Sequence, residues 1–203
     1  MENTKNTSQW NAKKTMAVVV MGLLTAIVVV LQIFASGIWL NPTTCITLVL
    51  APIIVGAALY GWKAGAWLGA VFSAIVLISG QAAFFMAMSI PGTIVTVMLK
   101  GTLAGIAGGA VYRLIEKEKN RTAAVVAAGI VTPVVNTGIY ILGCLVFFKD
   151  FLQAGVEADG RGLFAYIIFV MVGLNFVVEL AINLVLSSAI VLILNLVQKK
   201  IKV

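Results

Sequence analysis

Six long apolar segments, separated by short polar stretches, constrain this chain more than any other feature of its sequence. They cover approximately residues 15–35, 43–60, 63–80, 93–115, 122–148 and 163–198. About 20 apolar residues in a helix cross a bilayer core of about 30 Å. The sequence therefore predicts an all-α integral membrane protein of six transmembrane helices. Residues 1–14 are expected to form a polar cytoplasmic tail, and residues 15–203 a single transmembrane domain.

The composition supports this class and excludes several kinds of chemistry. The 203 residues are 62% hydrophobic and 10% charged, whereas soluble domains are typically about 25% charged. Histidine is absent, which excludes Ser-His and Cys-His catalysis and histidine-ligated metals. The ATP-binding pattern GxxxxGK[ST] is absent too. We therefore expect a protein that is not an enzyme, carries no metal or other cofactor and does not hydrolyse ATP by itself.

The two cysteines, Cys45 and Cys144, each lie in an apolar run. This position is typical of small residues that pack between helices, and a disulfide between them has no support in the sequence.

The distribution of lysine and arginine predicts the orientation in the membrane. With the N-terminus inside, eleven of the fourteen basic residues fall on the cytoplasmic side and two, Lys149 and Arg161, fall outside. Cytoplasmic loops carry such an excess of basic residues. We therefore expect both termini in the cytoplasm and a location in the plasma membrane, in a bacterium.

Two of the expected outer loops are unusually apolar. The stretches "SGIWLNPTT" and "SGQAAFFMAMSIPG" contain no charged residue but do contain Trp39 and Phe85. Such loops either rest in the lipid interface or fold back over a site. The pair Asn41-Pro42 also predicts a helix cap followed by proline at the first helical position.

A lysine lies inside the fourth segment, in "TVMLKGTLAGIAGGAVYR". Lys100 is about seven residues from the expected outer end, so it lies about 10 Å deep. A charge at this depth costs several kcal/mol unless it snorkels, pairs or faces water. The small residues Gly101, Gly105 and Gly109 follow it at spacings that favour close contact with a neighbouring helix.

Polar side chains also recur at helical spacing in the last two segments. In the sixth segment the polar positions repeat every four residues, which places them on one slowly drifting stripe: Asn175, Glu179, Asn183 and Ser187. In the fifth segment Thr132, Asn136 and Tyr140 share one face, and Pro133 frees a backbone carbonyl. A bundle of the last three segments would therefore surround an ammonium, a carboxylate, several amides and a phenol.

These residues allow three explanations. Lys100 and Glu179 could form a structural ion pair in a membrane protein of structural role. Glu179 could serve as the proton site of a small proton-coupled secondary carrier. The polar groups could instead line a pocket for a small solute, open to the outside beneath the apolar loops. The pocket accounts for the loops as well as for the helices.

Three features of the sequence are typical of one known family: the six spans, the hairpin "APIIVGAALYGWKAGAWLGAVFSAIV", and "LKGTLAGIAGGAVYR" leading into a basic inner loop. In these features the chain resembles the substrate-binding S components of energy-coupling factor (ECF) transporters. The resemblance implies a protein that binds a vitamin or related micronutrient from outside. It also implies a membrane coupling subunit and two cytoplasmic ATPase subunits as partners. Pantothenate, riboflavin, a folate and a modified nucleobase all stay open as substrates.

The resemblance also implies positions for the binding site and for the contact with the coupling subunit. The binding site is expected near the outer side, at Trp39, Asn41, Gln81, Lys100, Asn136, Tyr140, Asn175 and Glu179. Asn183 is expected to lie deeper. Small residues on the first helix, often paired alanines in the family, contact the coupling subunit. Here the matching residues are Gly22 and Ala26, so a glycine replaces the first alanine.

Overall fold

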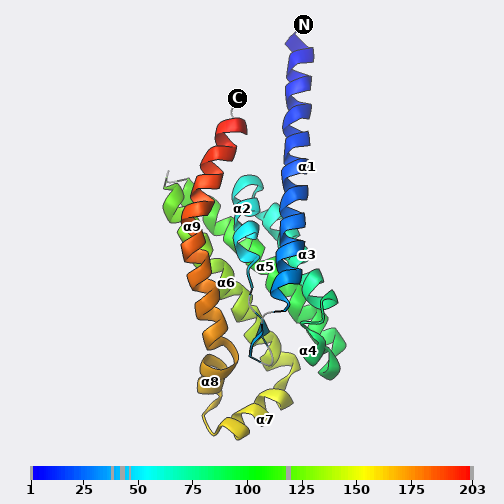
Figure 1. Ribbon diagram of the computed structural model, residues 1–203, viewed down its shortest axis with the longest axis vertical. Helices are drawn as coiled ribbons and strands as arrows, with labels where there is room; N and C mark the ends of the chain where they lie inside the picture. Colours follow the sequence, from blue (N-terminus) through cyan, green and yellow to red (C-terminus); the bar gives the residue numbers. More distant parts are fainter. Residues whose placement is uncertain (1, 38, 42–43, 46, 118–119, 202–203) are drawn as a thin grey trace.

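The computed structural model describes residues 2–37, 39–41, 44–45, 47–117 and 120–201, with side chains for 14–37, 47–117, 120–173 and 175–196. Long helices run side by side, and both ends of the described chain lie at the same end of the molecule (Figure 1). The elements, in chain order, are α1 (Glu2–Ala35), β1 (Trp39–Asn41), β2 (Thr44–Cys45), α2 (Leu50–Tyr60), α3 (Trp62–Ile78), α4 (Ala83–Met88), α5 (Ile90–Glu116), α6 (Arg121–Phe147), α7 (Lys149–Asp159), α8 (Leu163–Tyr166), the π-helical segment η1 (Ile167–Val172) and α9 (Gly173–Ile201).

The all-helical membrane class is as expected, but the lengths of the helices differ. Four of the described helices are long and apolar enough to cross a membrane, namely Lys14–Ala35, Ile90–Glu116, Arg121–Phe147 and Asn175–Leu196. The shorter apolar helices are α2, α3 and Leu163–Val172. The arrangement with six spans therefore stays a prediction.

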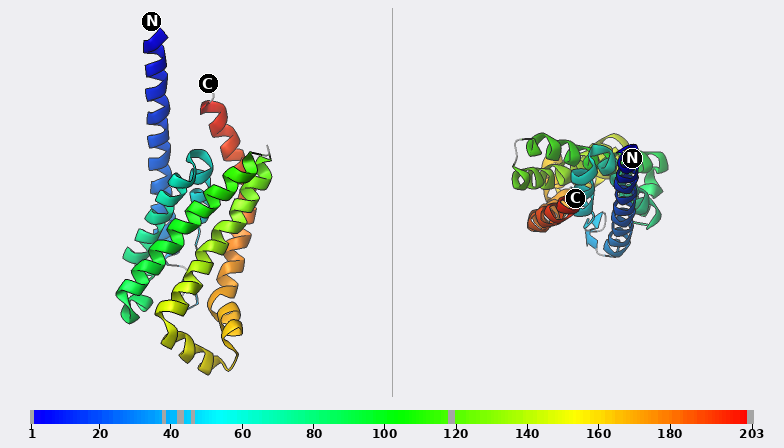
Figure 2. Two further views of the ribbon diagram at one scale, coloured as in Figure 1. Left: turned by 180° about the vertical axis from the view of Figure 1, so that it is seen from behind. Right: turned by 90° about the horizontal axis from the view of Figure 1, so that it is seen from above.

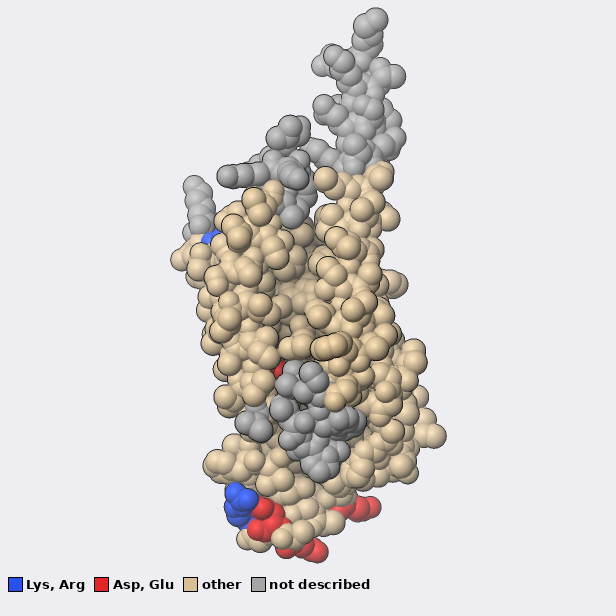
Figure 3. Space-filling view, in the orientation of Figure 1, with Lys and Arg blue, Asp and Glu red and all other residues tan. Residues whose placement is uncertain are grey.

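The charged side chains are unevenly placed along the bundle. On the face shown in Figure 3, the described flank is almost entirely uncharged, and charged side chains gather at the end that carries α7. The short helices α4, α7 and α8 lie at this end, opposite the termini (Figures 1 and 2). Such a flank is typical of a surface that faces lipid.

The expected helix start at Asn41-Pro42 is wrong. Asn41 lies in β1, which pairs antiparallel with β2, and α2 begins only at Leu50. Proline disfavours the α region for the residue before it, so Asn41 takes an extended conformation. Residues 2–14, expected as a separate tail, continue the helix of the first apolar segment.

The glycines of α5 pack directly against α3, as their spacing predicted. A Cβ added at Gly101 or Gly105 would collide with the backbone of Gly69 or Gly65 respectively, and the reverse holds as well. This close approach lets the Ser73 hydroxyl donate a 2.7 Å hydrogen bond to the Val97 carbonyl. The α3–α5 contact therefore fixes the rotation of α5, and with it the direction in which Lys100 points.

Candidate functional site

A cavity of about 80 Å³ lies inside the bundle between α3, α4, α5, α6, η1 and α9. It occupies the half of the bundle opposite the two termini, because its walls come from the C-terminal halves of α3 and α6 and the N-terminal halves of α5 and α9. A polar cavity of this volume holds several water molecules. A bound solute would therefore displace several waters.

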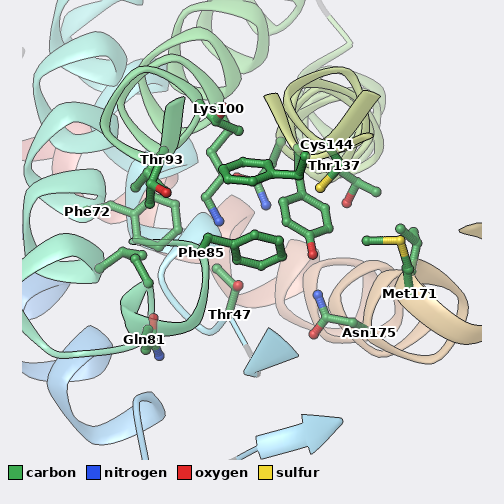
Figure 4. A pocket seen from close by; sticks show the side chains of 18 of the residues that line it. Thr47, Phe72, Gln81, Phe85, Thr93, Lys100, Thr137, Cys144, Met171 and Asn175 are labelled. Atoms are coloured by element: carbon green, nitrogen blue, oxygen red, sulfur yellow. The ribbon is translucent and has the colours of Figure 1, made fainter. Parts of the chain in front are cut away.

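Lys100 points into this cavity from α5 (Figure 4). Its Nζ lies 5.6 Å from the ring centroid of Phe72 and 5.8 Å from that of Tyr140. Both distances are within the range of cation–π attraction. The two rings stabilise the ammonium without neutralising its charge, so the cavity carries a positive group.

Glu179 places a carboxylate in the same cavity from α9, and its side chain is fully buried. Its Oε1 accepts a hydrogen bond of 3.1 Å from Nδ2 of Asn175. Its backbone carbonyl accepts one of 2.9 Å from Nδ2 of Asn183. Thr47 and Asn136 are the other polar side chains next to the carboxylate. Within the polar stripe of α9, Asn175 therefore orients the carboxylate of Glu179, whereas Asn183 bonds the backbone of the same residue.

The two opposite charges share the cavity without touching. Lys100 and Glu179 interact electrostatically. The ion pairs in the described part of the chain are Glu116–Arg121 and Asp159–Arg161, so no N–O distance of 4.0 Å or less joins Lys100 to Glu179. Both groups therefore act on the same cavity without forming a direct ion pair.

Several buried polar atoms on the cavity walls have no hydrogen-bond partner among the described residues. They are Nε2 of Gln81, Oγ1 of Thr96, Oδ1 of Asn136, Oδ1 of Asn175 and Oε2 of Glu179. Buried polar groups in proteins are nearly always hydrogen-bonded. Their concentration on one cavity means that water or the polar groups of a solute would complete these hydrogen bonds, and the acceptors among them lie near Glu179.

The remaining wall is apolar and aromatic. Phe85 of α4 lines the cavity, and its ring centroid lies 4.9 Å from that of Phe148 and 5.7 Å from that of Phe151. The charge-free stretch around α4 therefore does fold back over an internal site. Edge-to-face and tilted ring contacts of this kind add to the stability of such a wall.

The segment η1 adjusts the register of the last helix at the cavity. Tyr166 and Met171 are buried five residues apart, whereas Val170 is 40% exposed. In a regular α-helix the residue in phase with Tyr166 would be Val170. The wider π turn brings Met171 inward instead, in line with Asn175, and both line the cavity.

Most of the residues expected at the binding site meet in this cavity. Those that line it are Gln81, Lys100, Asn136, Tyr140, Asn175 and Glu179. The side chains of Trp39 and Asn41 lie outside the described part of the structure. Asn183 is buried but does not line the cavity. That any of these residues binds a substrate stays a prediction.

Some cavity residues were missed, although the sequence carried a signal for them. Thr93 and Thr96 lie on the same helical face as Lys100, at spacings of seven and four residues, and Cys144 follows Tyr140 by four. Cys144 is a buried free thiol. Thr47 lies in an irregular stretch between β2 and α2, where no periodicity could mark it.

The expected partner face on α1 is open. Gly22 and Ala26 are both exposed, and a Cβ added at Gly22 would meet no atom within 4 Å. Nothing in the described chain therefore occupies this face.

The fold and the cavity together define an all-helical membrane protein with an ammonium and a carboxylate in an internal polar cavity. The family model "ECF transporter, substrate-specific component" matches residues 16–193, and the chain belongs to this family. The chain is also 27% identical over 195 residues to the pantothenic acid transporter PanT of Lactococcus lactis subsp. cremoris (strain MG1363). The match covers 88% of this chain and 93% of that protein. No solved structure matches the chain.

Membership of this family has several consequences. The family consists of transporter components and not of enzymes, and its members are multi-pass proteins of the plasma membrane. They work with a vitamin-like substrate and with membrane and ATPase modules. The chain is thus a vitamin-uptake component.

Proposed function

We propose that this chain captures pantothenate from the outside of the cell and delivers it to an ATP-driven importer. The observation that carries the proposal is the placement of Lys100 and Glu179 in one cavity, where they interact without direct contact. The similarity to a pantothenic acid transporter supports this choice over riboflavin, a folate or a modified nucleobase.

The chemistry of pantothenate fits the walls of the cavity. Its carboxylate would accept a charge-assisted hydrogen bond from the ammonium of Lys100. Its hydroxyl and amide N–H groups would donate to Oε2 of Glu179 and to Oδ1 of Asn136 and Asn175, which have no other donor in the described structure. Its dimethyl group would pack on the aromatic wall at Phe85.

The position of the cavity agrees with capture from outside. We propose six membrane spans with both termini in the cytoplasm, because the basic residues are biased to that side. The cavity lies in the half of the bundle opposite the termini. It would then be near the outer surface. The partners would be a membrane coupling subunit, docked at Gly22 and Ala26, and two cytoplasmic ATPase subunits.

Binding to the purified chain tests the proposed substrate. We expect calorimetry to show saturable binding of pantothenate, and mass spectrometry to find it in protein purified from cells. Panthenol, which has a hydroxyl in place of the carboxylate, should bind more weakly. Tight binding of riboflavin or a folate, without binding of pantothenate, would contradict the choice of substrate.

Uptake assays test the mode of transport. Uptake should require the coupling subunit and the ATPase subunits. Uptake by the chain alone, driven by a proton gradient, would instead favour a secondary carrier that uses Glu179.

A further inference from the structure

Helix α1 carries a buried polar residue on the buried stripe of its described part. The inward-facing residues of the described part of α1 are Leu24, Val28, Gln32 and Ala35, at spacings of four, four and three residues. Gln32 is 1% exposed. A buried amide is costly unless it is hydrogen-bonded, so a glutamine at this position indicates a specific partner.

The partner of Gln32 is a residue of the cavity wall. Nε2 of Gln32 donates a 2.6 Å hydrogen bond to Oε1 of Gln81, which lines the cavity just before α4. Gln32 itself does not line the cavity. The two residues are 49 positions apart in the sequence. The hydrogen bond therefore connects α1, which lies outside the cavity, to a residue of the cavity wall.

The amide pair is only half satisfied. Oε1 of Gln32 and Nε2 of Gln81 are both buried and have no hydrogen-bond partner among the described residues. A hydrogen bond to Oε1 fixes the plane of the Gln81 amide and thereby the direction of its N–H donors. An acceptor on a solute would satisfy Nε2 of Gln81 and would favour the orientation that Gln32 holds. Solute binding and the α1 contact would then stabilise each other.

Another face of α1 carries the two small residues that are expected to contact the coupling subunit. Gly22 and Ala26 lie about 80° and 120° around the helix from Gln32 at about 100° per residue, and both are exposed. The same helix thus touches the cavity wall on one side and presents small residues on another.

We infer that Gln32 is a positioning residue, which holds Gln81 for the solute and transmits occupancy of the cavity to α1. This inference rests on the proposed function, from which it takes pantothenate as the solute. It assigns α1 a role in solute binding in addition to its exposed partner face.

A double-mutant cycle on the full chain tests this role. Gln32→Leu keeps the volume and suits the apolar stripe, so the melting temperature should not fall. The affinity for pantothenate should fall roughly five- to twentyfold, as for the loss of one hydrogen bond. Gln81→Leu should weaken binding at least as much. The double variant should be no weaker than Gln81→Leu, because Gln32 acts through Gln81.

Thr25→Val is the matched control. It also removes a hydrogen bond between α1 and another helix, the 3.2 Å bond from Nε1 of Trp67 to Oγ1 of Thr25, but Thr25 and Trp67 do not line the cavity. The affinity of the Thr25→Val variant for pantothenate should equal that of the unchanged protein. Equal losses for Thr25→Val and Gln32→Leu, additive losses in the double variant, or no loss for Gln32→Leu would each overturn the inference.

A second measurement does not depend on the solute. Cys144 is a buried free thiol on the cavity wall. In a Cys45→Ala background, a small thiol reagent should label Cys144 faster in the Gln32→Leu variant than in the Thr25→Val variant, because the wall at Gln81 is released. If the unchanged protein binds no pantothenate, the proposed substrate fails but the labelling still decides: faster labelling supports the role of Gln32, and equal rates refute it.

Discussion

Nδ2 of Asn175 donates a hydrogen bond to Oε1 of Glu179 one turn further along α9, and Oε2 of the same carboxylate has no partner among the described residues. One oxygen therefore fixes the carboxylate and the other can accept from a solute. Lys100 provides the opposite charge in the same cavity. This arrangement predicts separate roles for the two charged residues.

Replacing Lys100 by Met should weaken pantothenate binding about ten- to a hundredfold, or about 1.5–3 kcal/mol, because a charge-assisted hydrogen bond is lost. The melting temperature should hardly change, since Met keeps the length and apolar volume of the side chain. Calorimetry with panthenol is the control. Panthenol lacks the carboxylate, so its weaker binding should be nearly the same for the variant and the unchanged protein.

A lowered melting temperature with unchanged affinity would show that Lys100 compensates the buried charge of Glu179 instead of binding the solute. In that case Lys100→Met would leave a buried carboxylate without compensation, at a cost of about 3–5 kcal/mol. The melting temperature would then fall while the affinity for pantothenate stayed constant. Adding Glu179→Gln would restore the melting temperature.

Gly22→Leu or Ala26→Leu should reduce uptake and co-purification with the coupling subunit, because a bulky side chain prevents close helix contact. Binding of pantothenate to the isolated chain should persist. Gly138→Leu on α6 is a matched control, because a Cβ at Gly138 also meets no atom within 4 Å. A large loss of affinity with assembly intact would place this face of α1 at the solute site.

Gly69→Ala should destabilise the protein by about 1–3 kcal/mol, as overpacking does. The new Cβ would collide with the backbone of Gly101, where α3 and α5 touch. Gly138→Ala should be neutral or stabilising, because alanine favours a helix and no atom lies within 4 Å. Thermal unfolding in detergent measures both. Equal melting temperatures would show that the two helices can separate without cost.

Deletion of Phe169 should be tolerated. Phe169 lies in η1 and is 70% exposed, and its removal turns the π turn into an α turn while Tyr166 and Met171 stay in phase. Deletion of Val177, which is 61% exposed in α9, should abolish binding, because it rotates Met171 and Asn175 by about 100° relative to Glu179. Binding assays on both deletions compare them. Equal losses would show that the π turn itself is needed.

The proposed orientation predicts which loops an impermeant thiol reagent reaches on intact cells. In a background without the two native cysteines, Glu157→Cys should be labelled and Lys117→Cys should not. Both positions are exposed, so accessibility alone does not separate them. Labelling of residue 117 alone would reverse the orientation.

The sequence by itself determined the class of protein, and it identified most of the polar residues that line the cavity. Apolar length and helical periodicity are local properties, so they marked the long helices, the stripe through Asn175 and Glu179, and the glycines that pack α5 on α3. Lys100 could be identified because a charged side chain inside an apolar segment is energetically costly and usually has a function.

The tertiary structure decided which of these groups meet. It placed Gln81, Lys100, Asn136 and Glu179 around one cavity, and it paired Gln32 with Gln81 across 49 residues. It also replaced the expected helix start at Asn41 by a strand. These features depend on contacts between segments far apart in the chain, and on a register change at η1 that no local pattern records. A periodic pattern shows which face of a helix is polar, but only packing shows what that face opposes.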